Sequence, residues 1–138
     1  MSDLLQMLFG NRWRPDFHSY RECGCFHDSV EFGKACRPGF VYIVQFGDLY
    51  KIGATNGKKG IASLKSRINA VNKQRGEKGR TIGYIETNCA QGLERWMHYE
   101  YRKQRVHTEF FRLTETDLNA IRAMNQFNGG TLVFRSFS

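Results

Sequence analysis

Two strand-like runs that lie close together in the sequence constrain the fold most. Residues 40–46 read FVYIVQF and residues 49–53 read LYKIG, and Val, Tyr, Ile and Phe are common in both. These residue types favour extended backbone, and the Gly-Asp pair between the runs is a typical tight turn. The pattern therefore predicts a β-hairpin that places Tyr42 and Lys51 near one another.

An amphipathic helix and a third strand are expected after the hairpin. Residues 61–74 carry apolar side chains at three- and four-residue spacing, as on one face of a helix. These apolar residues are Ile61, Leu64, Ile68 and Val71. Arg67 falls at the edge of this stripe, so it can be held by the core and still reach outward. Residues 81–87, TIGYIET, are rich in β-branched and aromatic types and predict a strand.

The last third of the chain predicts two more helices and short strands. Residues 91–105 show a second helical apolar stripe, while residues 109–113, EFFRL, suit a short extended segment. Thr114 and Asp117 form a capping signature that starts a helix, and residues 129–137 read as a last strand. The sequence thus predicts a small α+β domain with a central antiparallel or mixed three-stranded sheet flanked by helices.

The net charge of +8 is concentrated in one segment. Residues 1–38 hold five basic and five acidic side chains, whereas residues 51–80 hold nine basic side chains and one acidic side chain. Such a field attracts polyanions and makes binding weaken with salt, although a solvated charged surface has the same composition. The expected DNA-contacting residues in this segment are Lys58, Lys59, Lys65, Lys73 and Arg75.

The N-terminal segment, MSDLLQMLFG, has an apolar run too short to span a bilayer and lacks the flanks of a signal peptide. We expect a short amphipathic helix there. No other stretch approaches membrane-spanning length, which predicts a cytoplasmic protein, in the host cell if it is phage-encoded, with no membrane partner. Its oligomeric state, monomer or homodimer, stays open.

Cysteine usage gives a weak metal signal. Cys23, Cys25, His27 and Cys36 lie close together, and their side chains suit zinc. Their spacing lacks the C-x-x-C knuckle of common structural sites, so reduced thiols are the expectation and zinc is not an expected cofactor. The isolated Cys89 is expected to pack.

The ordered motifs resemble those of the GIY-YIG nuclease superfamily. The tripeptides Phe40-Val41-Tyr42 and Lys51-Ile52-Gly53 are followed by Arg67 in a helix and by Glu94 in a helix after a third strand. The likeness is greatest to a small phage and bacterial branch in which the second motif reads K-I-G and the glutamate helix reads E-x-x-x-H before an E-x-F segment. The residues that match this second part are Glu94, His98, Glu109 and Phe111.

This resemblance divides the chain into three parts. Residues 1–36 are an N-terminal extension, residues 37–115 form the GIY-YIG-like core, and residues 116–138 add a helix and a strand that complete the domain.

The resemblance also implies a catalytic set of Tyr42, Lys51, Arg67, His98 and Glu94. Tyr42 would face the scissile phosphate and receive a proton from the attacking water, which requires a cation to lower its pKa of roughly 10. Lys51 replaces the usual tyrosine and would supply that cation or hold the phosphate. Arg67 would hold phosphate oxygens in the manner of a bidentate guanidinium.

Glu94 is the implied ligand of a single Mg²⁺ or Mn²⁺, since carboxylate oxygen suits these hard cations. His98, one turn further along, would order that carboxylate, touch the metal or handle a proton. Gly53, Glu109 and Phe111 are expected to be structural, Gly53 because a side chain would obstruct the substrate or the turn. Each of the catalytic residues also has an ordinary structural role open to it, such as a buried tyrosine or a surface ion pair.

The sequence thus predicts a metal-dependent endonuclease that hydrolyses phosphodiester bonds in DNA. The main alternative is a nucleic-acid-binding domain of the same fold that cuts poorly or not at all. A third interpretation, an interaction protein that docks through residues 1–36, does not explain the motif order.

Overall fold

A six-stranded antiparallel sheet is the frame of the part of the chain that the computed structural model describes, residues 38–87, 90–127 and 130–136. In chain order the strands are β1 (Gly39–Phe46), β2 (Leu49–Asn56), β3 (Arg80–Thr87), β4 (Arg105–His107), β5 (Phe110–Phe111) and β8 (Phe134–Ser136). In space their order is β4-β5-β2-β1-β3-β8. The predicted α+β class is confirmed, and the sheet is larger than the three strands expected.

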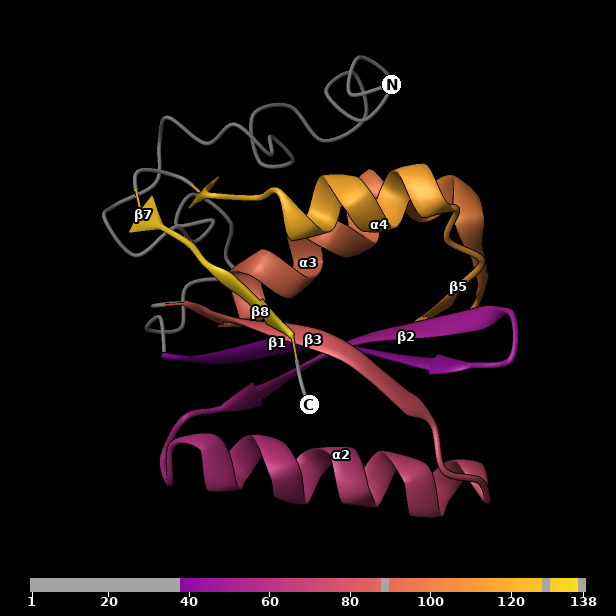
Figure 1. Cartoon of the computed structure of the whole chain (residues 1–138), viewed down its shortest axis with the longest axis horizontal. Helices are drawn as coiled ribbons and strands as arrows, with labels where there is room; N and C mark the ends of the chain where they lie inside the picture. Colours follow the sequence, from indigo (N-terminus) through magenta and orange to yellow (C-terminus); the bar gives the residue numbers. More distant parts are fainter. Residues whose placement is uncertain (1–37, 88–89, 128–129, 137–138) are drawn as a thin grey trace, which may run out of the picture.

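Three α-helices cover the two faces of this sheet in the described residues. They are α2 (Ile61–Arg75), α3 (Ala90–Glu100) and α4 (Glu115–Arg122). Figure 1 shows α2 on one face and both α3 and α4 on the opposite face. A separate two-stranded sheet pairs β6 (Gln126–Phe127) with β7 (Gly130–Thr131). No described helix is long and apolar enough to cross a membrane.

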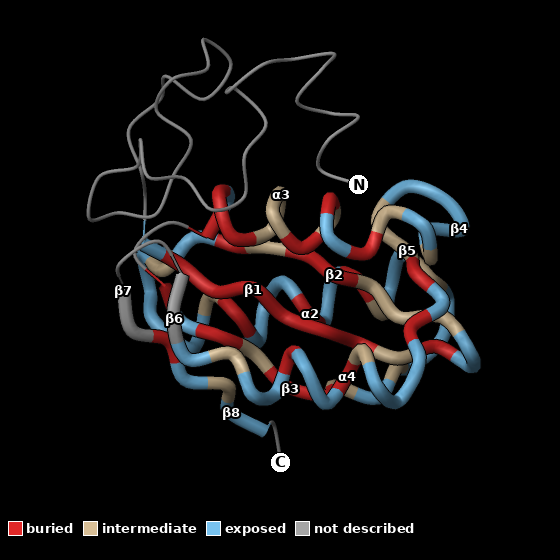
Figure 2. Tube along the Cα trace, turned by 90° about the horizontal axis from the view of Figure 1, so that it is seen from above, coloured by how far each residue is buried: buried red, intermediate tan, exposed pale blue. Residues whose placement is uncertain are grey.

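The predicted hairpin forms β1 and β2, joined by a two-residue turn in which Gly47 has φ 64°. Positive φ at the first turn position suits the twist of hairpin strands and is tolerated best by glycine. β1 also pairs with β3, so both of its edges are hydrogen-bonded, and it has α2 over one face and α3 over the other. This double burial, visible in Figure 2, is why its sequence does not alternate between apolar and polar residues.

Two apolar clusters follow from this arrangement. The cluster on the α2 face consists of Phe40, Tyr42, Val44, Phe46, Leu64, Ile68 and Val71. The other cluster contains Val41 and Ile43 of the same strand together with apolar residues of α3 and α4. The expected stripe of α2 is confirmed except at Ile61, which is 41% exposed because it begins the helix beyond the edge of this cluster.

Two element boundaries differ from the sequence expectation. The helix expected over residues 91–105 ends at Glu100, and a 3₁₀ turn, η3 (Arg102–Gln104), leads into β4, which pairs with β5. The segment expected as one last strand is divided between β7 and β8, and β8 pairs with β3. β4 pairs with the strand that follows it, whereas β8 pairs with a distant strand, and in both places strand pairing overrides the local pattern.

The capping box at Thr114 is confirmed. The Asp117 backbone N–H donates to the Thr114 hydroxyl oxygen at 3.1 Å, and the Thr114 backbone N–H donates to the Asp117 carboxylate at 2.9 Å.

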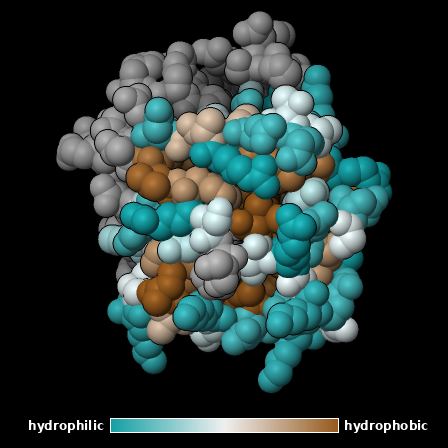
Figure 3. Space-filling view, in the orientation of Figure 1, coloured by the Kyte–Doolittle hydropathy of each residue, from teal (hydrophilic) through white to brown (hydrophobic). Residues whose placement is uncertain are grey.

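The expected N-terminal helix, the four possible zinc ligands and Cys89 lie outside the described residues. Figure 3 shows a face in which hydrophilic side chains surround smaller hydrophobic areas.

Candidate active site

The candidate site lies where β2 passes the end of its neighbour β5. β5 pairs with β2 only at Tyr50 and Lys51, and the Ile52 backbone N–H then donates to the Glu109 carbonyl oxygen at 3.0 Å. Gly53 follows on β2 and is opposite Tyr42 of β1. A Cβ atom at Gly53 would overlap the Tyr42 hydroxyl group. Gly53 is therefore required by the tyrosine ring that crosses it, and not by the turn.

Tyr42 lies under the surface, with only 1% of the residue exposed. Burial raises the pKa of its phenol well above the ordinary value of 10.0, and the cation that acts against this shift is Arg67. Glu109 and Glu94 raise the pKa further, which also shows that these four side chains share one electrostatic environment. In the metal-free protein Tyr42 is thus a neutral hydroxyl group at pH 7 and not a base.

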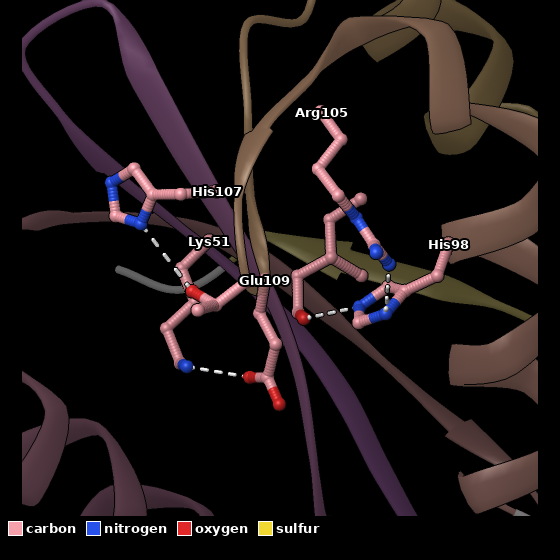
Figure 4. A network of polar contacts seen from close by, with 7 residues as sticks. Lys51, His98, Arg105, His107 and Glu109 are labelled. Carbon is pink, nitrogen blue, oxygen red and sulfur yellow. Dashed lines mark hydrogen bonds and ion pairs between the residues drawn. The ribbon is translucent and has the colours of Figure 1, made fainter.

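Lys51 forms a short ion pair with Glu109. Its Nζ lies 2.6 Å from Oε1 of Glu109, and Figure 4 shows the two side chains pointing toward one another, Lys51 from β2 and Glu109 from the turn between β4 and β5. The ammonium group also lies 5.3 Å from the ring centroid of Phe110. The sequence predicts only a structural role for Glu109, and no local pattern signals its side-chain contact because its partner is 58 residues away. Phe111, by contrast, is fully buried and is structural as expected.

An open cleft of about 470 Å³ lies beside this ion pair. It is lined by Lys51, Arg67, Val71, Gln74, Arg75, Thr108, Glu109 and Phe110. Helix α2 contributes Arg67, Val71 and Gln74 at three- and four-residue spacing, so one flank of the helix forms a wall. The cleft therefore brings together Lys51 and Arg67, two of the cations that the motif order singled out.

Glu94 lies on α3, which reaches the site from the opposite face of the sheet, and the helix is fixed there by the buried Leu93 and Met97. Burial raises the pKa of the Glu94 carboxyl group to about 7, and the charge of Glu109 adds to this effect. Lys51, Arg95 and Arg67 lower the pKa, but less strongly. The carboxylate thus lacks enough positive charge nearby, and a bound cation would supply it.

His98 is held by contacts on both ring nitrogens. Nε2 lies 2.8 Å from the Ile52 carbonyl oxygen, and because a carbonyl only accepts, this nitrogen carries the proton. Nδ1 lies 3.5 Å from Nη2 of Arg105 (Figure 4). Burial lowers the pKa of His98, so it is neutral at pH 7. These contacts tie α3 to β2 and so fix the position of Glu94; a proton-transfer role stays a prediction.

The residues expected to contact DNA are divided between surfaces. Arg75 lines the cleft, with its guanidinium 4.8 Å from the Phe110 ring centroid and 5.5 Å from that of Phe46. Lys73, only two residues earlier, lines a different groove of about 680 Å³ together with Asn69. The remaining three, Lys58, Lys59 and Lys65, are exposed.

Comparison with known proteins assigns the sequence of this chain to a family. Residues 39–126, well over half of the chain, match the T5orf172 domain. The chain belongs to the T5orf172 domain family. This is a phage-associated domain found in endonuclease-like proteins. No curated protein and no solved structure matched the chain.

The match covers the hairpin, the cleft and the glutamate helix of this T5orf172 domain, which makes a nuclease-like or DNA-binding role plausible. No group of three or more His, Cys, Asp or Glu side chains suited to a metal occurs among its described residues. Glu94 still fits Mg²⁺, because this ion commonly uses one or two protein carboxylates and completes its shell with water and substrate phosphate.

Proposed function

We propose that this T5orf172 domain is a metal-dependent DNA endonuclease with a GIY-YIG-type site. The observation that carries the proposal is the convergence of Lys51 and Arg67 on one cleft, with Tyr42 and Glu94 in the same electrostatic environment. Phosphodiester hydrolysis needs cations that hold a phosphate, a group that orients water and a metal ligand. These four side chains supply those groups.

The cations of the cleft bind the DNA backbone. Arg67 offers two parallel N–H groups to two phosphate oxygens, and Lys51 acts as a compact point charge. Both stabilise the additional negative charge that develops when the phosphorus atom becomes five-coordinate. Arg75, which also lines the cleft, contacts a neighbouring phosphate and keeps the strand aligned.

Tyr42 orients the attacking water, which has to reach a hydroxyl group that is almost fully buried in the free protein. Its neutral hydroxyl group accepts a hydrogen bond from that water and donates one to the phosphate. The absence of a side chain at Gly53 leaves room for this hydroxyl group. Its proton-accepting role, implied by the superfamily, requires positive charge beyond that of Arg67, since burial outweighs Arg67 in the free protein.

Glu94 holds Mg²⁺ or Mn²⁺, and the ion when bound stabilises the departing 3′ oxygen. The raised pKa of Glu94 supports this assignment, because the free carboxylate is under-neutralised. His98 keeps α3 against β2 through the Ile52 carbonyl and so maintains the distance between Glu94 and the cleft.

Incubation with supercoiled plasmid tests the proposal. Nicking in Mg²⁺ and none in EDTA is expected. Glu94→Gln should lower the rate about 100-fold or more, since the leaving oxygen loses several kcal/mol of stabilisation. Glu115→Gln is the matched control, because it removes one carboxylate from the exposed surface of α4, and Glu115 does not line the cleft. Equal rates for the two variants would refute the metal-ligand role.

A DNA-binding domain that does not cut is the second candidate. The Lys51–Glu109 pair partly neutralises the cleft, and Tyr42 is protonated in the free protein. Both features favour binding over reaction. Binding of the plasmid without any nicking in Mg²⁺ or Mn²⁺ would select this second function.

A further inference from the structure

The ion pair between Lys51 and Glu109 differs from three other ion pairs among the described residues. Its atoms are 2.6 Å apart, and the Lys51 side chain is only 14% exposed. Three other pairs, Arg75–Glu77, Arg112–Asp48 and Arg122–Glu115, have separations of 3.5, 3.3 and 3.4 Å and more exposed side chains. The short pair also lines the cleft, whereas surface pairs contribute little.

The backbone fixes Glu109 where its carboxylate meets Lys51. The Glu109 carbonyl oxygen accepts from the Ile52 N–H at 3.0 Å, one residue from the lysine. Thr108, just before Glu109, has φ 44°, the one non-glycine residue with positive φ in the described chain. A β-branched residue rarely adopts this conformation, so the surrounding turn must hold it there. The glutamate is thus delivered to the lysine by a constrained turn.

We propose that Glu109 is the positioning residue of Lys51 and that a substrate phosphate shares the ammonium group with it. This inference rests on the proposed nuclease function. A lysine side chain has four rotatable bonds, and an unpaired Lys51 would sample many positions. The carboxylate uses one of the three N–H donors and leaves the others for a phosphate oxygen in the cleft. The Phe110 ring, 5.3 Å from Nζ, limits the movement of the ammonium further.

Removal of the Glu109 charge should have opposite effects on DNA affinity and on the rate of cleavage. The negative charge of Glu109 weakens the attraction between the cleft and the backbone of DNA, so its removal should tighten binding. The loss of the ion pair also frees Lys51 to leave its catalytic position, and displacements of about 1 Å can lower rates ~100-fold. A residue that only supported the fold would not separate affinity from rate in this way.

The experiment compares Glu109→Gln with Glu115→Gln, which changes the net charge equally but on the opposite face of the sheet. Binding to a fluorescein-labelled duplex is measured in EDTA, and plasmid nicking is measured in Mg²⁺ at saturating protein. Glu109→Gln should bind about threefold to tenfold more tightly and cut at least ~10-fold more slowly than the wild type. Glu115→Gln should show neither change.

Two further variants connect the effect to the lysine. Glu109→Asp keeps the charge and shortens the side chain, so binding should stay at the wild-type level while cleavage slows. In a Lys51→Ala background, Glu109→Gln should not lower the nicking rate further, because the group that it positions is missing. An additive loss of rate in that background would overturn the positioning role.

The failure of this inference and the failure of the nuclease proposal look different. If the wild type binds DNA and does not nick it, the nuclease proposal fails, and tighter binding by Glu109→Gln than by Glu115→Gln still supports the sharing of Lys51. If the wild type nicks DNA and Glu109→Gln matches Glu115→Gln in both measurements, the inference about Glu109 is wrong and the nuclease proposal stands. Circular dichroism confirms that each variant is folded.

Discussion

The buried position of Glu94 should make the stability of the metal-free protein fall as pH rises. The pKa of this carboxyl group is raised from its ordinary value of 4.5 to about 7 by burial first and by Glu109 second. The folded protein therefore binds the proton more tightly than the unfolded chain does. The stabilisation is fully present below about pH 4.5 and is lost as pH rises through about 7.

The size of the effect follows from the two pKa values. A tenfold difference in proton affinity corresponds to about 1.4 kcal/mol, so the difference between 4.5 and about 7 gives roughly 3 kcal/mol. Glu94→Gln stays neutral at every pH and avoids this loss. The variant should be as stable as the wild type near pH 4 and more stable by up to roughly 3 kcal/mol near pH 8.

Urea unfolding of both proteins across this pH range, in EDTA, measures the difference. Other titrating groups, including His98, are present in both proteins, so their contributions cancel in the subtraction. Mg²⁺ should raise the stability of the wild type near pH 8 and leave Glu94→Gln unchanged, because only the ionised carboxylate holds the ion. A difference between the two proteins that does not change with pH would refute the reasoning.

Three smaller predictions concern individual positions. Gly53→Ala should displace the Tyr42 ring, slow plasmid nicking and lower the free energy of unfolding by about 1–3 kcal/mol in urea titrations; unchanged nicking would contradict this. Thr108→Gly should raise the melting temperature, since glycine relieves roughly 1 kcal/mol of cost at φ 44°; a lower value would show that the side chain stabilises the turn. Arg75→Ala should weaken DNA binding and flatten its salt dependence more than Lys73→Ala, because Arg75 lines the cleft; equal slopes would place DNA elsewhere.

Much of the site could be predicted from the order of motifs in the sequence. The predicted hairpin forms, with Lys51 opposite Val44 and Tyr42 opposite Gly53. Arg67 projects from the flank of α2 into the cleft, as its place beside the apolar stripe indicated. The pKa of each side chain in the site, and the charged groups that set it, could not be predicted from the sequence. Tyr42 has a raised pKa because a helix buries it, and the cation near it is Arg67 where Lys51 was expected.

The sequence by itself determined the type of each main element, because hydrophobic spacing, β-branched runs and capping residues act over a few neighbouring positions. The tertiary structure decided which distant groups meet. Lys51 pairs with Glu109 across 58 residues through the register of β5 on β2. Arg75 and Lys73 are two residues apart and yet line different grooves, since they lie roughly 200° apart around the axis of α2. Such contacts depend on strand register and helix docking, which no short stretch of sequence specifies.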